Sequence, residues 1–163
     1  MAQALILGVG NILMQDEGIG VRALEWLQAC YACAEVKMID GGTMGLDLLH
    51  YLPGLEHLLI LDAVEAGKAA GEITILTGQE APAFFGMKIS PHQMGVQDLL
   101  ATAQLLGYTP PAVVILGVQP AQLNVGLDMS PAVTVQVEPL ARLALVQLAE
   151  WGYQMCALTE EAG

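Results

Sequence analysis

Short apolar runs alternate along this chain with segments of helical period. The runs predict five strands, at 4–9, 35–40, 57–63, 72–76 and 112–119. Apolar runs that alternate with helices are typical of a largely parallel sheet covered on both faces. The run at 72–76 is short and follows a tight, turn-rich connection, which suits an antiparallel edge strand. We therefore expect an α/β fold: a three-layer α/β/α sandwich around a mostly parallel, five-stranded twisted sheet with one antiparallel edge strand.

Two segments in the first third of the chain have the apolar spacing of helices. The first is expected over 18–29, where the apolar positions recur at offsets of four, seven and eight, namely Ile19, Ala23, Trp26 and Leu27. The second follows Gly45, carries Leu46, Leu49 and Leu52 at threefold spacing, and is expected to end before Pro53.

Two later helices are each expected to begin at a Ser-Pro step, 90–91 and 130–131. The serine hydroxyl can cap the helix, and proline suits the first helical position. The earlier helix should end at Gly107 and bury Val96, Leu99, Leu100, Ala103 and Leu106. The later one should run to 151–152 with a kink at Pro139, and residues from about 154 should form a frayed tail.

Length and charge narrow the functional classes. A chain of 163 residues predicts a single domain, 1–163. A formal net charge of −12 argues against a nucleic-acid partner, which would need a basic face. Gly, Pro, Asp or Glu interrupts every apolar run before the ~20 residues of a membrane span, so we expect no membrane segment. We also expect a monomer, and a cytoplasmic location because three cysteines and no basic leader indicate neither disulfides nor secretion.

Two motifs are similar to functional motifs, one for dinucleotide binding and one for zinc or redox chemistry, but other features argue against both functions. Gly8-Val9-Gly10-Asn11 after the first strand is similar to a dinucleotide-binding turn, but position 13 is Leu rather than the third glycine, so glycines that only make a tight turn fit better. The pair Cys30 and Cys33 has zinc or redox spacing. It lies at the carboxyl end of the first helix, where the helix dipole disfavours a thiolate, so we expect ordinary, partly buried cysteines.

Three acids lie at the ends of predicted strands. Glu17 comes after the first strand, Asp40 ends the second, and Asp62 interrupts the apolar run of the third. Because carboxyl ends of parallel strands share one edge of a sheet, we expect the three acids to converge on one crevice, with His92 at the start of a helix as a fourth member. Carboxylates and an imidazole indicate a divalent metal or a water-activating site. Asp16 and Glu17 could instead be favourable charges at a helix amino terminus.

Taken in order, five motifs closely resemble the maturation endopeptidases of nickel-iron hydrogenases. They are 7–14, 16–22 with its Asp-Glu-Gly, the Asp-Gly-Gly-Thr of 40–43, the acid Asp62, and the Ser-Pro-His-Gln within 88–93. The resemblance covers nearly the whole chain. It implies a protease that removes a short carboxyl-terminal extension from the hydrogenase large-subunit precursor after nickel insertion.

The resemblance also assigns roles to residues. Glu17, Asp62 and His92 match the metal-contacting positions of the family, and Asp40 matches a further acid important for activity. We expect Asp40 or Asp62 to activate water, and a site this sparse to hold free nickel weakly or not at all, so that the metal arrives on the precursor. Two other functions use the same crevice without catalysis: a nickel metallochaperone, and a nucleotide- or metabolite-binding module.

Overall fold

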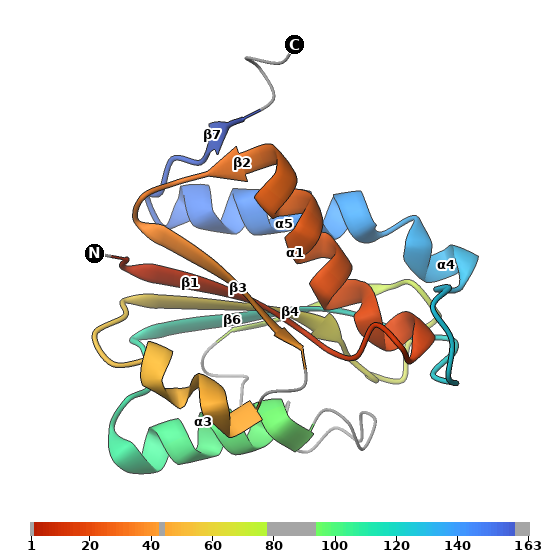
Figure 1. The fold of residues 1–163 in the computed structure, drawn as a ribbon, viewed down its shortest axis with the longest axis horizontal. Coiled ribbons are helices and arrows are strands. Elements are labelled where there is room, and N and C mark those ends of the chain that lie inside the picture. Colours follow the sequence, from red (N-terminus) through yellow and green to blue (C-terminus); the bar gives the residue numbers. More distant parts are fainter. Residues whose placement is uncertain (1, 43–44, 78–93, 159–163) are drawn as a thin grey trace.

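Five strands form one central sheet in the part of the chain that the computed structural model describes, residues 2–42, 45–77 and 94–158 (Figure 1). They are β1 Ala4–Val9, β3 Val36–Gly42, β4 His57–Ala63, β5 Ile73–Thr77 and β6 Ala112–Val118. Their spatial order is β3-β1-β4-β6-β5. Neighbours are parallel except β5, which pairs antiparallel with β6 at the edge. The predicted sheet and its antiparallel edge strand are confirmed.

Helices cover both faces of this sheet, as Figure 1 shows. On one face lie α1 (Ile19–Cys30) and α5 (Val137–Glu150), which pack against each other. On the other face lie the 3₁₀ helix η2 (Gly45–Tyr51) and α3 (Met94–Leu106). Two short elements complete the helices: η1 (Gln15–Gly18), which leads into α1, and α4 (Pro131–Thr134), which precedes α5. The three-layer α/β/α architecture is therefore as predicted.

Alternation along the strands divides the core between the two faces. In β1, Ala4 and Ile6 belong to the apolar core under α1 and α5, whereas Leu5 and Leu7 belong to the core under α3 and η2. Successive strand side chains point to opposite faces, which produces this division. Because both faces are covered, the strands are apolar at nearly every position.

Helix α1 approaches the sheet closely at Gly20. A Cβ at this position would overlap the carbonyl oxygen of Leu61 in β4 and come within 2.7 Å of that of Val9 in β1. Glycine is therefore required by contact between the helix and two strand backbones. This contact fixes the amino end of α1, and with it η1, against the carboxyl ends of β1 and β4.

The last helix differs from its prediction. It is interrupted at 135–136, so that α4 and α5 are separate helices rather than one kinked helix. Pro139 lies in the first turn of α5 and has no N–H to donate to the carbonyl of Val135, so a continuous helix would lose that bond. The stretch 131–150 has the length and composition of a membrane-crossing helix, but Leu140, Ala144 and Leu148 bury one side of it in the core.

Three smaller expectations are also wrong. The segment after Gly45 is helical and ends before Pro53 as predicted, but it is a 3₁₀ helix, and Leu48 joins Leu52 among its buried neighbours. Leu106 at the end of α3 is exposed, although Leu99, Leu100 and Ala103 are buried as expected. The chain does not fray directly after 154, because β7 (Cys156–Ala157) pairs antiparallel with β2 (Tyr31–Ala32). The predicted helix start at 90–93 and the side chain of Val96 lie outside the residues that the structure describes.

Candidate functional site

The predicted acids lie at the topological switch point of the sheet. From β1 the chain crosses to β3 on one side and then returns to β4 on the other side. In open α/β sheets, ligands bind at such a point, outside the carboxyl ends of the strands. Glu17 in η1 follows β1, and Asp62 lies near the end of β4. Both side chains are fully buried.

Gly10 lies against the backbone of Glu17 and near the side chain of Asp62. It has φ +124°, and a Cβ there would overlap the carbonyl oxygen of Glu17 and lie 3.6 Å from Oδ1 of Asp62. This glycine therefore permits the tight turn that folds η1 back over the end of β1. The Glu17 carbonyl occupies the space beside Gly10. This supports the interpretation of Gly8 and Gly10 as glycines that the turn itself requires.

Hydrogen bonds orient both acids. The amide of Asn11 donates to Oε1 of Glu17 at 3.0 Å. The amide of Ala63 donates to Oδ1 of Asp62 at 2.8 Å. Strand alternation places Asp62 on the same face as Leu58 and Ile60, under α3. The sequence analysis did not predict that the amide of Asn11 binds Glu17, although Asn11 directly follows Gly10 in the turn after the first strand.

Asp40 joins the same edge through its backbone, but its side chain is exposed. It pairs with Gly8 in the parallel register of β1 and β3. Two residues later, the carbonyl of Gly42 accepts a bond from the amide of Gly10 at 2.9 Å. Within the described ranges, no three His, Cys, Asp or Glu side chains are grouped to hold a metal ion. Glu17 and Asp62 thus form a pair of buried acids, with Asp40 at the rim of the edge.

The fourth predicted member, His92, lies outside the described residues. The described part of α3 begins two residues later, at Met94. Figure 1 shows the amino end of α3 on the side of the molecule where the parallel strands end. The predicted role of His92 stays a prediction from sequence.

Asp16 is fully buried, and its role is structural. Its carboxylate accepts hydrogen bonds from the amides of Ala121 and Gln122, both at 2.8 Å, and from the amide and hydroxyl of Ser130, at 2.6 and 2.8 Å. The Ser130 hydroxyl thus donates to Asp16 and does not cap α4, contrary to the expectation. Asp16 ties the loop 119–130 to η1, whereas the carboxylate of Glu17 accepts its bond from Asn11, the residue after Gly10.

The remaining titratable residues named by the sequence lie away from these acids. Cys30 and Cys33 are half-buried and free, as expected. His57, at the amino end of β4, bonds through Nδ1 to the hydroxyl of Tyr153 at 2.7 Å. Burial lowers the pKa of His57, against the opposing effect of Glu56. Burial, reinforced by Glu35 and Glu56, raises the pKa of Tyr153.

These two residues line a shallow cavity of about 570 Å³ with Glu35, Glu56 and Trp151. The cavity lies at the amino ends of the strands, opposite the paired acids. Its histidine packs on Trp151 at a ring separation of 4.5 Å, as a packing residue would. The location of the paired acids, rather than the size of this cavity, therefore identifies the candidate site.

An α/β sandwich with two buried acids at its switch point defines a class of proteins that bind or process a ligand at this edge. Comparison with known proteins makes the class specific. The profile of the HycI hydrogenase maturation protease family matches residues 21–147. The chain is 41% identical to the Hydrogenase 2 maturation protease of Escherichia coli over 160 residues, which cover 97% of this chain and 96% of the relative. It is also 41% identical over 156 residues to the hydrogenase expression/formation protein HupD of Rhodobacter capsulatus, covering 94% of this chain and 74% of the relative.

Solved structures agree with this result. The hydrogenase maturating endopeptidase HybD from Escherichia coli superimposes with a TM-score of 0.90 and 38% identity, over 98% of this chain and 99% of that one. The nickel-iron hydrogenase maturation protease HybD from Thermococcus kodakarensis superimposes with a TM-score of 0.70 and 25% identity, over 90% and 99% of the two chains. The chain belongs to the hydrogenase maturation protease family and is a peptide hydrolase.

Proposed function

We propose that this endopeptidase removes a short carboxyl-terminal peptide from the nickel-loaded large-subunit precursor of a nickel-iron hydrogenase. The membership of the family supports the protease activity. The observation that carries the recognition of nickel is the pair of fully buried acids at the switch point: Glu17, whose side chain accepts a bond from the amide of Asn11, and Asp62, whose Oδ1 lies near Gly10.

The donor set fits a metal that arrives with the substrate. Carboxylate oxygens bind a borderline divalent ion such as nickel, but two carboxylates make an incomplete coordination shell. The described residues add no third ligand to them. The sequence offers His92 as one more, and the precursor supplies the rest. A protease that completes the coordination shell of the precursor's nickel binds the nickel-loaded precursor and not the nickel-free one.

The chemistry of peptide hydrolysis requires a polarised carbonyl and an activated water. Nickel held by the precursor polarises the scissile carbonyl as a Lewis acid. Glu17 and Asp62 are buried and held by backbone amides, which suits fixed contacts to a metal. Asp40 is exposed at the same edge, so it can accept a proton from the attacking water as the C–O bond forms and pass it to the leaving amine as the C–N bond breaks. We therefore assign Asp40 the role of general base.

The experiment is incubation of nickel-loaded and nickel-free precursor with this protein, followed by intact-mass spectrometry. We expect one discrete loss of mass from the carboxyl terminus of the nickel-loaded form, and no change in the nickel-free form. Equal cleavage of both forms would contradict recognition through nickel. Tight binding of free nickel in calorimetry, with no change in precursor mass, would indicate a metallochaperone instead.

A further inference from the structure

Three apolar side chains are exposed together at the carboxyl edge of the sheet. Leu13, Val125 and Leu127 expose 56%, 84% and 62% of their surface. The amide of Gly126 donates to the carbonyl of Leu13 at 2.8 Å, and the amide of Gln15 donates to the carbonyl of Gly126 at 3.0 Å. These bonds join the two segments side by side in a parallel bridge. We call Leu13, Val125 and Leu127 the apolar rim.

The apolar rim is held in place by its supporting residues. Asp16 binds the loop 119–130 at both of its ends through four hydrogen bonds. Gln15 adopts a φ of +52°, which is unfavourable for a residue with a side chain, and its Oε1 accepts a bond from the amide of Asn124 at 3.3 Å. A buried carboxylate and a residue at positive φ thus hold the loop in the conformation that exposes Val125 and Leu127.

The rim does not contribute to the apolar core. None of its three side chains belongs to either core cluster of the described residues. Val146 on α5 and Leu105 on α3 are also exposed, the latter beside exposed Leu106 and Tyr108, but this group lies at the end of α3 that leads to the amino end of β6, away from the acids. Rigidly held apolar side chains that gather at one place on a surface mark an interaction site, because their order has been established before binding.

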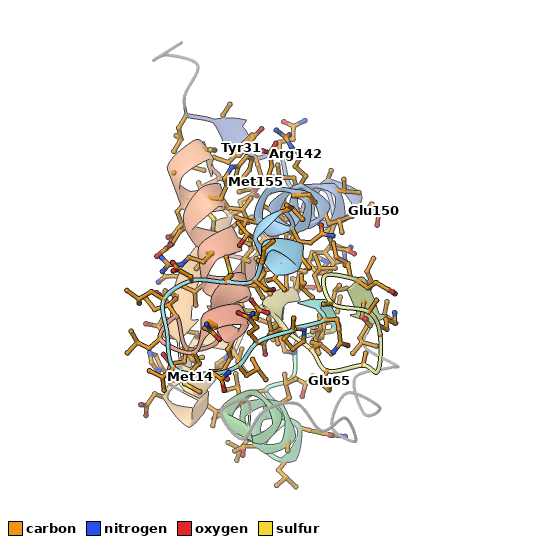
Figure 2. The ribbon with its side chains drawn as sticks, turned by 90° about the vertical axis from the view of Figure 1, so that its right-hand side faces the viewer. Met14, Tyr31, Glu65, Arg142, Glu150 and Met155 are labelled. Atoms are coloured by element: carbon orange, nitrogen blue, oxygen red, sulfur yellow. The ribbon has the colours of Figure 1, made fainter. Side chains whose placement is uncertain are left out.

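The rim is connected to the paired acids by two consecutive hydrogen bonds. The amide of Leu13 donates to Oδ1 of Asn11 at 2.9 Å, and the amide of Asn11 donates to Glu17. Figure 2 looks onto this edge, with Met14, the neighbour of Leu13, labelled beside the light-blue loop 119–130. The apolar rim is therefore adjacent to Glu17.

Charge decides between the possible occupants. The protein carries a net charge of −12. Exposed Asp40 lies near the carboxyl end of β3, exposed Asp128 lies in the loop 119–130, and Figure 2 labels half-buried Glu65 on the same side of the molecule. A second copy of the same acidic chain would be repelled. A peptide that carries apolar side chains together with Lys or Arg matches both the rim and the acids around it.

We propose that the apolar rim docks an apolar segment of the precursor, flanked by basic residues, next to the bond that is cut. This proposal rests on the proposed function, since it assigns the precursor as the partner. Contact with the rim holds the precursor while Glu17 and Asp62 coordinate the nickel that the precursor carries. The rim therefore acts in binding and not in the chemical step.

The test compares two matched variants with exposed apolar side chains replaced by serine. The rim variant combines Leu13→Ser, Val125→Ser and Leu127→Ser, and the control combines Leu105→Ser and Val146→Ser. We expect the KM for nickel-loaded precursor to rise at least about tenfold in the rim variant, because apolar contact area is lost, while kcat at saturation stays within about twofold. The control should match the wild type, and both variants should keep the wild-type Tm.

Binding is measured separately, by calorimetry of the same precursor with the same substitutions in an Asp62→Asn background. A loss of affinity of about tenfold in the rim variant, together with weaker binding at higher salt, supports the proposal.

Unchanged affinity and unchanged KM in a folded rim variant would overturn it. A wild-type dimer that the rim substitutions dissociate, seen by sedimentation, would also overturn it. Failure of the wild type to cut the precursor would refute the proposed function only, because the binding comparison remains readable.

Discussion

Two neighbouring acids with the same charge and the same burial perform different tasks. Asp16 accepts four hydrogen bonds from the loop 119–130, whereas the side chain of Glu17 accepts a bond from the amide of Asn11, beside Gly10, which Asp62 also approaches. Sequence alone offered a common explanation for both, as favourable charges at the start of a helix. The direction of each side chain decides between a structural and a functional role.

Replacement of Asp16 should destabilise the protein strongly. Asp16→Ala leaves three amides and one hydroxyl of the loop without their acceptor, which we expect to cost about 3 kcal/mol or more. Urea unfolding followed by circular dichroism measures this loss. The control is Asp128→Ala, an exposed acid of the same loop, which should change the unfolding free energy by less than about 0.5 kcal/mol. Equal stability of the two variants would contradict the structural role of Asp16.

Replacement of Asp62 should remove activity without unfolding the protein. Asp62→Asn keeps the shape of the side chain but weakens its bond to a metal, so we expect no processing of nickel-loaded precursor in a mass-spectrometric assay and a cooperative thermal transition. We predict the same outcome for His92→Ala from the sequence. Asp47→Asn, an exposed acid on η2, serves as the control with full activity. Full activity of either test variant would remove that residue from the site.

At the scale of elements, contact between α1 and the sheet positions the site. Gly20 allows the helix backbone to lie against the carbonyls of Leu61 and Val9. The pattern of apolar residues predicted α1 and its buried stripe, since that pattern depends only on helical period. It did not predict that the helix would pack at this distance.

Gly20→Ala should be destabilising even though alanine favours helices. The added methyl group overlaps the Leu61 carbonyl, and we expect a net loss of about 2 kcal/mol or more despite a gain of about 1 kcal/mol in helix propensity. Chemical denaturation measures the difference. Glu25→Ala, at an exposed position of the same helix, should change the free energy of unfolding by less than about 0.5 kcal/mol. A stabilised Gly20→Ala would show that α1 can move away from β4.

Another element shows the limit of local patterns. Pro139 predicted a kink in the last helix. The helix is interrupted, but at 135–136, before the proline. The missing N–H removes a bond to the carbonyl four residues earlier, so the disturbance appears on that side. A local rule therefore gives the cause of such a break more reliably than its place.

At the scale of the whole molecule, charge governs association. A net charge of −12 at pH 7 leads us to predict a monomer, because like-charged copies repel. Analytical ultracentrifugation at pH 7 should show one species at the monomer mass. Self-association should increase as the pH approaches the sequence pI of 4.3, where the repulsion disappears. A stable dimer at pH 7 that persists at low salt would contradict this prediction.

The fold was largely accessible from the sequence, and the site only in part. Each strand of the central sheet has an apolar run that predicts it to within two residues at either end. Strand ends alone predicted that Glu17, Asp40 and Asp62 lie at one edge of the sheet, and the resemblance to the family distinguished Glu17 from Asp16 and added the roles of the acids. The separation of Asp16 from Glu17, the bond from Asn11 and the exposure of Asp40 did not follow, because each depends on side-chain direction and on distant segments.

By itself, then, the sequence determined the succession of strands and helices, the parallel sheet and the edge at which the acids lie. Periodicity and strand polarity are properties of neighbouring residues, so a linear chain displays them. Only the tertiary structure decided which acid supports the loop, which acids lie together, and which apolar side chains remain exposed beside them. These depend on residues more than 100 positions apart, such as Asp16 and Ser130, and contacts of that kind exist only in the folded chain.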